Sequence, residues 1–404
     1  MKRTKDSNLI WIGAIPEDWS VLRGKNVVKK LKRPVKETDG VITCFRDGEV
    51  TLRSKRREEG YTFSDLEAGY QGIEPGDLVI HGMDGFAGAI GVSDSRGKGT
   101  PVLNVLDSKY DKRYLMYYFR TIAKCGYFES VATGIRVRTC DTNWNKISVT
   151  PCLVPTPPEQ SRIASFLDVR CGKIDEAIAK HKALIEKLDE YRKAVITEAV
   201  TKGVSGKKNW ASKAIKHSFR IVPGATPASG NPEYWDGDII WITPSDYKTR
   251  DHYVSAGAKT ITEDGYDSCS TRLVPAGSLI FSKRAPIGTV AISKTALCTN
   301  QGCLSCVPKK DTNVEFFYYA FIAYLEVFDV LGSGTTFKEI STSAFSNVKI
   351  ETPSPEEQQE IVAYLDKKCA AIDSAKERHT QLIAKLEEYK KSLIYNAVTG
   401  KIEC

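Results

Sequence analysis

The sequence predicts an α+β fold in which two similar, mixed α/β globular modules are separated by two long coiled-coil helices. Its 404 residues are enough for two to three domains. Two observations predict this fold class. A segment of about 45 residues occurs twice with the heptad pattern of a long helix. The stretch before each copy contains short β-type runs between residues rich in Gly, Pro, Thr and Ser.

The helical segment is an internal repeat. The two copies align without a gap at an offset of 198 residues, so that Pro157 of the first copy corresponds to Pro355 of the second. About half of the aligned positions are identical, which indicates a duplicated unit. The identical pairs include Cys171/Cys369, Asp175/Asp373, His181/His379, Lys187/Lys385, Tyr191/Tyr389 and Val200/Val398.

Each copy has the pattern of a coiled-coil helix. From Leu167 and from Leu365 onward, the positions that would face a neighbouring helix alternate in steps of four and three for more than four heptads. A helix of about 40 residues would be about 60 Å long. The pattern assigns these apolar residues to the helix–helix seam: Leu167, Ile174, Ile185, Leu188, Leu365, Ile372, Ile383 and Leu386.

The seam also contains His181 and His379. They could form a metal or proton site across two helices, or they could be polar seam residues that fix the register of the pair. The second interpretation is favoured because neither histidine is accompanied by a carboxylate pair. Cys171 and Cys369 are interpreted as small seam residues.

The segments between the helices form the globular modules. Each module contains one helix-like aromatic segment, Tyr114–Ile122 in the first and Val314–Val330 in the second. The modules share this plan but little sequence, whereas the helices remain alike. This contrast indicates a common scaffold that carries two specificities. The predicted domains are residues 1–156 and 204–354 for the modules, and 157–203 and 355–404 for the helices.

Composition excludes several classes of protein. The formal charge of +8 is compatible with nucleic-acid binding without requiring it. The longest apolar run, Phe316–Leu325, is about half of the roughly 20 residues that span a bilayer, so no membrane association is expected. No apolar signal core follows Met1, and the 11 scattered cysteines have no framework spacing. We therefore expect reduced thiols and a cytoplasmic location.

No catalytic or metal site is predicted. Asn231–Tyr234 resembles the Asn-Pro-Pro-Tyr motif of amino-methyltransferases, but Glu233 replaces a proline and no Gly-rich cofactor loop precedes it. Cys303 and Cys306 could bind zinc, but a strand-borne pair without a second such pair is more typical of core thiols. The five histidines provide no defensible Ser/His/Asp or Cys/His set.

Several short motifs occur in order along the whole chain. The first module contains Ile15-Pro16-Glu17-Asp18-Trp19 and Met83-Asp84-Gly85-Phe86. The second contains Gly224-Ala225-Thr226-Pro227, Trp241-Ile242-Thr243-Pro244 and Thr299-Asn300-Gln301-Gly302. Each helix is entered through a Pro-x-Glu-Gln motif. Together with the alternation of modules and helices, these motifs resemble the specificity subunit of type I restriction–modification enzymes.

The resemblance implies a function. Each module would be a target recognition domain that reads one half of a bipartite, asymmetric site in double-stranded DNA. The helices would pack antiparallel, set the spacer between the half-sites and dock two methyltransferase subunits, and two translocase–nuclease subunits could join for restriction. This chain would be non-catalytic. S-adenosylmethionine, and ATP and Mg for restriction, would be bound by the partner subunits.

Geometry supports the antiparallel arrangement. Two similar modules on one chain are related by a pseudo-two-fold axis only if the seam helices run antiparallel. Proteins with such symmetry read two half-sites on one face of the DNA. Lengthening a helix should then change the spacer and leave the recognised bases unchanged.

Base-reading residues are predicted from side-chain chemistry. Arg and Lys recognise guanine, Asn and Gln recognise adenine, and small hydroxyl groups reach groove edges from loops. Lys283, Arg284, Arg136 and Arg138 are the preferred candidates because each lies between a β-type run and a Gly-rich turn. Any of the candidates could instead contact phosphate. The full set is Arg46, Arg53, Lys55, Arg56, His81, Asp84, Arg136 and Arg138 in the first module, and Thr226, Ser229, Lys248, Lys283, Arg284, Thr335, Thr336 and Lys338 in the second.

Two other functions stay open at this point. A stand-alone methyltransferase or nuclease would need a cofactor loop or an acidic metal cluster, and neither is found in the sequence. A coiled-coil scaffold or regulator could use the same helices to bind other protein or nucleic-acid partners.

Overall fold

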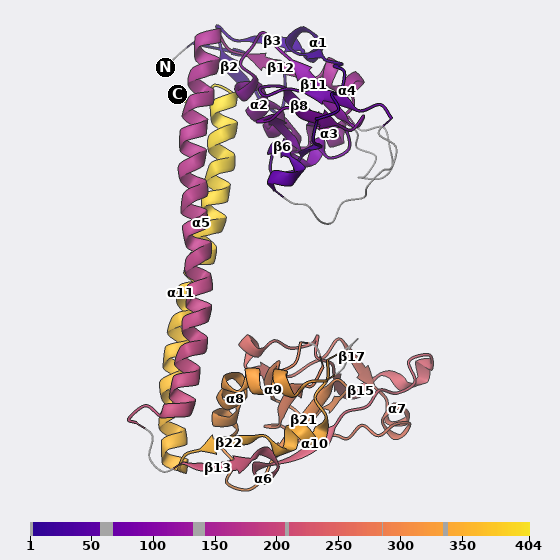
Figure 1. The fold of residues 1–404 in the computed structure, drawn as a ribbon, viewed down its shortest axis with the longest axis vertical. Coiled ribbons are helices and arrows are strands. Elements are labelled where there is room, and N and C mark those ends of the chain that lie inside the picture. Colours follow the sequence, from indigo (N-terminus) through magenta and orange to yellow (C-terminus); the bar gives the residue numbers. More distant parts are fainter. Residues whose placement is uncertain (1–2, 57–67, 132–141, 207–209, 285, 334–337) are drawn as a thin grey trace. The chain divides into compact units, whose positions relative to one another are not determined.

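The computed structural model describes residues 3–56, 68–131, 142–206, 210–284, 286–333 and 338–404 (Figure 1). The chain divides into two compact units. Unit 1 comprises Met1–His181 with Gln381–Cys404, and unit 2 comprises Lys182–Thr380. Each unit therefore contains one globular module and parts of both long helices. The division into four domains by residue range stays a prediction.

The two long helices are α5 (Pro157–Lys202) and α11 (Pro355–Val398). In unit 1, Leu167 and Ile174 of α5 share a hydrophobic core with Leu393 and Ala397 near the end of α11. In unit 2, the end of α5 shares a core with the start of α11. Within each unit the start of one helix thus packs against the end of the other, so the predicted antiparallel pairing is confirmed (Figure 1).

The seam residues lie between the helices as the heptad pattern requires. Leu167, Ile174, Leu365 and Ile372 are buried. The remaining four, Ile185, Leu188, Ile383 and Leu386, are half-buried between exposed neighbours.

Ion pairs accompany the seam in both units. Lys390 Nζ lies 2.7 Å from Asp175 Oδ1 in unit 1, and Arg192 Nε lies 3.7 Å from Asp373 Oδ1 in unit 2. These residues occupy equivalent positions of the repeat. The internal identity of the two aspartates is therefore explained by interhelical pairing.

The module of unit 1 is built around a four-stranded antiparallel sheet with the order β4-β11-β8-β9. Three antiparallel two-stranded sheets accompany this sheet, and a fourth, β3 with β12, lies next to the start of α5. The strands are β1 (Thr4–Asp6), β2 (Ala14–Pro16), β3 (Ser20–Arg23), β4 (Lys29–Lys30), β5 (Ile42–Cys44), β6 (Val50–Leu52), β7 (Gln71–Ile73), β8 (Leu78–His81), β9 (Ile90–Val92), β10 (Gly97–Gly99), β11 (Leu103–Asp107) and β12 (Pro151–Val154). The helices are α1 (Gly24–Val27), α2 (Lys112–Lys124), α3 (Tyr127–Ser130) and α4 (Trp144–Val149).

The module of unit 2 repeats this plan with a five-stranded sheet, β14-β21-β18-β19-β16, and an added sheet, β17-β15-β20. Its strands are β13 (Ala211–Ala214), β14 (Phe219–Pro223), β15 (Trp235–Ile242), β16 (Tyr253–Val254), β17 (Lys259–Ile261), β18 (Leu279–Ser282), β19 (Val290–Ser293), β20 (Cys298–Thr299), β21 (Cys303–Pro308) and β22 (Lys349–Thr352). Its helices are α6 (Ile215–Ser218), α7 (Glu263–Asp267), α8 (Val314–Ala323), α9 (Leu325–Leu331) and α10 (Thr342–Asn347).

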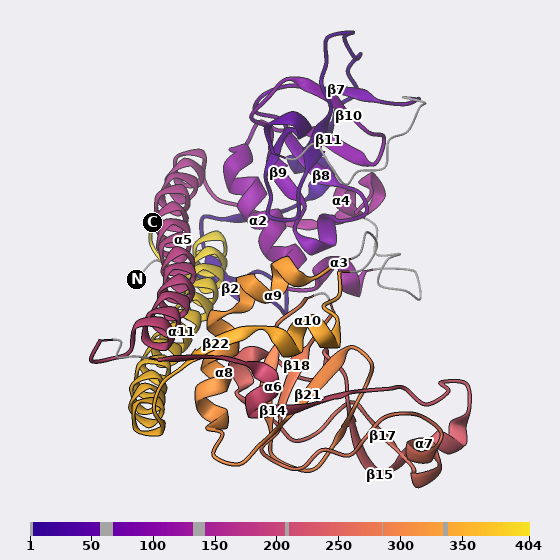
Figure 2. The same ribbon diagram turned by 60° about the horizontal axis from the view of Figure 1, so that its bottom comes forward.

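The two modules share one topology. Strands β4, β11, β8 and β9 correspond in order and direction to β14, β21, β18 and β19, and the pair β3/β12 corresponds to β13/β22. Helix α8 shares a core with β18, α5 and α11 (Figure 2). Because α8 is covered on several sides, most of its residues are apolar. The run from Phe316 to Phe321 is buried core. The single aromatic segment expected at Val314–Val330 is interrupted at Tyr324, where α8 ends and α9 begins.

Equivalent contacts attach each module to the start of a long helix. The indole N–H of Trp19 donates to Glu159 Oε2 at 2.9 Å, and that of Trp210 donates to Glu357 Oε1 at 3.4 Å. The hydroxyl groups of Tyr117 and Tyr319 donate to Asp168 and Asp366 at 2.9 and 2.7 Å. The side-chain amides of Gln160 and Gln358 donate to the carbonyl oxygens of Pro155 and Pro353. The Pro-x-Glu-Gln motif at each helix start thus has a structural role.

Candidate nucleic-acid interface

The same pattern of backbone hydrogen bonds holds the end of an equivalent strand in each module. In unit 1 the N–H of Gly82, which follows β8, donates to Val102 O at 2.8 Å, and Thr142 N–H donates to Gly82 O. In unit 2 the N–H of Lys283, which follows β18, donates to Gly302 O at 2.9 Å, and Ile340 N–H donates to Lys283 O. Gly82 and Lys283 therefore occupy equivalent positions with different side chains, as expected of two sites that read different bases.

Glycine at position 82 follows from close packing. A Cβ atom added there would lie 2.7 Å from Val102 O, and one added at Gly85 would lie 2.2 Å from Thr142 Oγ1. The glycines of this strand end thus allow the chain to pack closely.

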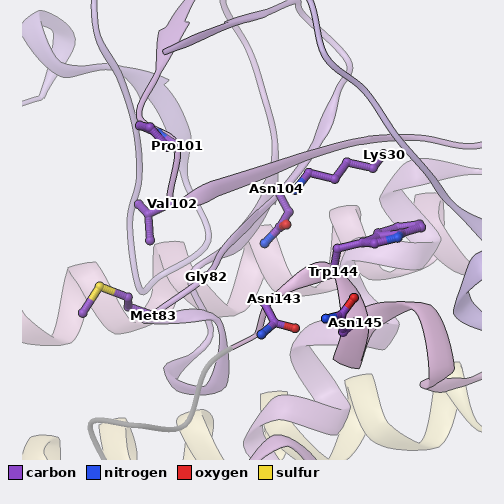
Figure 3. Close-up of a pocket in the computed structure, with 9 residues that line it drawn as sticks. All are labelled: Lys30, Gly82, Met83, Pro101, Val102, Asn104, Asn143, Trp144 and Asn145. Carbon is purple, nitrogen blue, oxygen red and sulfur yellow. The ribbon is translucent and has the colours of Figure 1, made fainter. Parts of the chain in front are cut away.

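A cleft of about 360 Å³ opens beside the strand end of unit 1 (Figure 3). Asn104 lies in its interior, where its amide donates to Thr142 O at 3.0 Å. Asn143 caps α4 by accepting a hydrogen bond from Lys146 N–H. Lys30 and Asn145 are exposed. An amide can pair with a base edge and a lysine with a phosphate, which is the chemistry that DNA recognition requires. The lining residues are Lys30, Gly82, Met83, Pro101, Val102, Asn104, Asn143, Trp144 and Asn145.

Three predicted residues of the first module come together at this strand end. His81 Nδ1 accepts hydrogen bonds from the N–H groups of Met83 and Asp84, at 3.2 and 3.0 Å. Burial lowers the pKa of His81, so the imidazole is neutral at pH 7 and holds the turn. The guanidinium of Arg46, which is exposed, lies 2.8 Å from Asp84 Oδ1. Arg46 and Asp84 are thus the groups that remain accessible to a ligand here.

The other described candidates of the first module have partners around the β5–β6 hairpin. Arg56 pairs with Asp47 and Glu49, and it also lies over the ring of Phe45 at 4.0 Å. Lys55 Nζ donates to Ser95 Oγ at 2.7 Å, and Arg53 Nε donates to Thr43 Oγ1 at 3.4 Å. DNA contacts by Lys55 or Arg56 would compete with these intramolecular interactions.

In the second module the structure brings Lys283 and Arg284 together on one carboxylate. Glu339 accepts from Lys283 Nζ at 2.8 Å and from Arg284 Nε at 2.7 Å. Thr226 Oγ1 donates to Gln301 Oε1, in the loop that also receives the Lys283 N–H. Lysine, arginine, threonine and glutamine side chains thus converge at one strand end.

The remaining candidates of the second module have another partner, are exposed, or lie outside the described residues. Lys338 pairs with Asp329 at 2.6 Å, and Ser229 and Lys248 are exposed. Four predicted residues lie outside the described residues: Arg136, Arg138, Thr335 and Thr336.

Sequence reasoning missed two further groups of basic residues in unit 1. Lys29 and Lys30 of β4 and the nearby Lys32 are exposed on the strand that borders the cleft. The signal for this group was available, because residues 25–36 are the most basic part of the first 60 residues.

The second group lies where the module meets α11. Burial lowers the pKa of Lys124, and the positive charges of Arg120, Lys390 and Lys391 lower it further. In unit 2 the equivalent position carries Glu326, which pairs with Lys193 at 2.9 Å. Unit 1 thus has like charges where unit 2 has an ion pair, and a phosphate group would compensate them.

No metal centre is evident in the described part of the chain. No group of three or more His, Cys, Asp or Glu residues there could hold a metal ion. Cys303 and Cys306 are buried strand residues, and burial raises the pKa of Cys303 to about 12, so its thiol stays protonated. Pro232–Tyr234 forms a short 3-10 turn capped by Asn231. No described helix is long and apolar enough to cross a membrane.

Comparison with known proteins relates this chain to DNA specificity subunits. The family model of the Type I restriction modification DNA specificity domain matches residues 207–387. The MjaIX specificity subunit of Methanocaldococcus jannaschii is 42% identical over 161 residues, which cover 39% of this chain and 37% of that protein. The MjaX specificity subunit of the same organism is 23% identical over 97% of this chain and 95% of its own length. A chain from a solved type I R-M system has a similar fold, with a TM-score of 0.78 at 16% identity over 96% of this chain and 99% of that one.

Proposed function

Because this chain belongs to the family of type I restriction–modification specificity subunits, we propose a role in DNA recognition for each of its parts. The chain is a DNA-recognition subunit without catalytic activity of its own, and it works in a complex with other subunits. Each module reads one half of a bipartite, asymmetric DNA site. The matches do not favour the alternatives of a stand-alone enzyme or an unrelated scaffold.

One observation carries the half-site proposal. The two modules share a topology, yet their equivalent strand ends differ in chemistry. Unit 1 presents Arg46, Asp84 and the amide-lined cleft, whereas unit 2 presents Lys283, Arg284 and Gln301. Different donors and acceptors on one frame would recognise different bases, so the two half-sites need not match.

We also propose which subunits join this chain and which cofactors they bind. We assign two methyltransferase subunits and, for restriction, two translocase–nuclease subunits to the complex, and we place S-adenosylmethionine, ATP and Mg on those subunits. This chain positions the complex on the DNA. The modules fix which bases are bound, and α5 and α11 set the spacer between the half-sites.

Sequencing of adenine methylation tests the proposal. A host with this chain and its methyltransferase should methylate one asymmetric split motif, and a host without this chain should not. Replacing residues 204–354 by the second module of a relative should change one half of the motif and leave the other half intact. A methylome that is the same in both hosts would contradict the proposal.

Point variants refine the same experiment. Lys283→Ala combined with Arg284→Ala should relax or weaken one half of the motif, and Arg46→Ala should affect the other half. Each lost bidentate base contact is worth about 1–3 kcal/mol. Lys294→Ala is a matched control, because the exposed Lys294 follows Ser293, which pairs with Ser278 at the opposite end of β18. A control effect equal to that of the Lys283/Arg284 variant would argue against base reading there.

A further inference from the structure

The cleft of unit 1 contains a buried amide whose oxygen has no hydrogen-bond donor. Asn104 of β11 is 5% exposed, and its amide nitrogen donates to Thr142 O at 3.0 Å and to Ile80 O at 3.4 Å. The opposite orientation would place the amide oxygen against two carbonyl oxygens, so the orientation is fixed. No donor of the described residues reaches Asn104 Oδ1. Because buried acceptors are normally paired, this oxygen indicates a donor that enters the cleft from outside.

The rest of the cleft suits a flat ring that carries a negative charge. Met83, Val102 and Trp144 give it apolar walls, and the exposed Lys30 supplies a positive charge (Figure 3). Trp144 is half-buried and packs against the core of unit 1, which holds its indole in place. The volume of about 360 Å³ lies within the range of small-ligand sites, about 300–1,000 Å³.

Unit 2 lacks this chemistry at the equivalent positions. Asn104 and Leu304 each follow by two residues the carbonyl group that receives the strand-end N–H described above, and Leu304 is buried core. Trp144 is the first residue of α4, and its counterpart Thr342 is the first residue of α10. The buried amide and the indole thus belong to one module and are not required by the shared topology.

The depth of Asn104 restricts which part of a nucleic acid can reach it. In intact duplex DNA the base edges lie at the floor of a groove, which is about 8.5 Å deep on the major-groove side. An atom in the interior of a protein cleft cannot meet an atom at the floor of a groove, so the ligand must protrude. A base that has left the stack does so, and proteins that bind such a base stack it on aromatic or apolar side chains and hydrogen-bond its edge.

We propose that the cleft of unit 1 binds a single unstacked nucleotide whose base carries an exocyclic amino group. The amino group donates to Asn104 Oδ1, the ring lies against Trp144, and the phosphate pairs with Lys30. Adenine, cytosine and guanine have such an amino group, and thymine has none. The nucleotide is a base extruded from bound DNA or a free nucleotide, because the same contacts serve both. For the extruded base this rests on the proposed function, since unit 1 then recognises one base of its half-site outside the helix.

Titration calorimetry of the full-length chain tests the free nucleotide. At least one of dAMP, dCMP and dGMP should bind at least about tenfold more tightly than dTMP or deoxyribose 5-phosphate, which has no base. Asn104→Leu and Trp144→Thr, which introduce the residues of unit 2, should remove this preference, whereas Trp144→Phe keeps a stacking surface and most of the affinity. Lys29→Ala is the control for Lys30→Ala, because Lys29 is exposed on the same strand and does not line the cleft.

Mismatched DNA tests the extruded base, with the chain bound to its methyltransferase subunit and the motif taken from methylation sequencing. A mismatch lowers the cost of extrusion, so a mismatch at one position of the half-site read by unit 1 should tighten binding by about tenfold. Methyltransferases extrude their own target base, so the informative position is the one whose gain is lost in Asn104→Leu and in Trp144→Thr.

The outcomes separate the two sources and the proposed function. A mismatch gain that both variants abolish identifies an extruded base, and a preference among free nucleotides without that gain identifies a free nucleotide. If neither assay responds to the variants, and melting curves show that they fold, the cleft binds no nucleotide and the proposal is wrong. A split methylation motif would then leave the proposed function standing. If Asn104→Leu does not fold, the comparison of Trp144→Thr with Trp144→Phe decides.

Discussion

The attachment of each module to its long helix can be tested by removing one indole N–H at a time. In Trp19→Phe and in Trp210→Phe the hydrogen bond to Glu159 or Glu357 is lost while an aromatic ring remains. The two sites are equivalent in the repeat but differ in geometry. Trp19 is 1% exposed and its bond measures 2.9 Å, whereas Trp210 is half-buried and its bond measures 3.4 Å.

The expected magnitudes follow from this difference. A hydrogen bond to a charged group stabilises a fold by about 1.5–3 kcal/mol. Loss of the second ring from the fully buried site of Trp19 adds about 1 kcal/mol. We therefore expect the free energy of unfolding to fall by about 3 kcal/mol in Trp19→Phe. The longer, partly solvated bond of Trp210 should be worth only about 1 kcal/mol.

Differential scanning calorimetry measures both effects on the same chain. For units of this size, 1 kcal/mol lowers the melting temperature by about 2–4 °C, so the transition should fall by about 6–12 °C in Trp19→Phe and by about 2–4 °C in Trp210→Phe. Glu159→Gln, which keeps an acceptor oxygen, should lie between the two. Equal shifts for the two tryptophan variants, or a larger shift for Trp210→Phe, would refute the reasoning from burial and distance.

Three further predictions concern spacing, charge and pH. Inserting one heptad into α5 and α11 at equivalent positions adds about 10.5 Å of helix, which is the length of about three base pairs. Methylation mapping should then show a longer spacer between unchanged half-sites, and an unchanged spacer would contradict the proposed role of the helices. Lys124→Glu should allow an ion pair with Lys391 like that of Lys193 with Glu326, and stability should change by less than about 1 kcal/mol. DNA binding, measured by fluorescence anisotropy, should weaken, and the slope of its salt dependence should fall by about one. An unchanged DNA affinity and salt dependence would show that this cluster does not contact DNA. Because the pKa of His81 is lowered in the folded chain, the unfolded chain binds the proton more readily, and the contribution of His81 to stability should be lost as pH falls below about 6.5. His81→Asn should flatten the dependence of the free energy of unfolding on pH in this range, and an unchanged dependence would contradict the reasoning.

The long helices could be predicted because their information is local. The steps of four and three, the repeated Pro-x-Glu-Gln entry and the duplicated sequence are all visible within about 45 residues. The contacts that fix the modules to the helices could not be predicted in this way. Trp19 and Glu159 are 140 residues apart, and Tyr319 and Asp366 are 47 apart. Pairing over such separations depends on the folded arrangement and leaves no periodic signal.

The candidate interface was predicted less completely for the same reason. Basic side chains in loops were selected by chemistry, but the structure pairs several of them with distant acids, as in Lys55 with Asp94, 39 residues away. The exposed Lys29 and Lys30 of β4 form no ion pair with an acid of the described residues, and Lys30 lines the cleft. Local charge thus identified the basic region, whereas tertiary pairing decides which of its charges remain available to DNA.

The two modules are alike at the positions that attach them to the long helices and differ at the strand ends proposed to read DNA. Positions that attach a module to a helix are kept as the same pairs, Trp with Glu and Tyr with Asp. Positions at the strand ends differ, with Gly82 in one module and Lys283 in the other, although the same backbone hydrogen bonds hold them. A change at a strand end therefore leaves the attachment untouched, and a module with the same anchors can replace another. Specificity for one half-site can then change without loss of the scaffold, which is the physical basis for expecting a module exchange to alter one half of the motif alone.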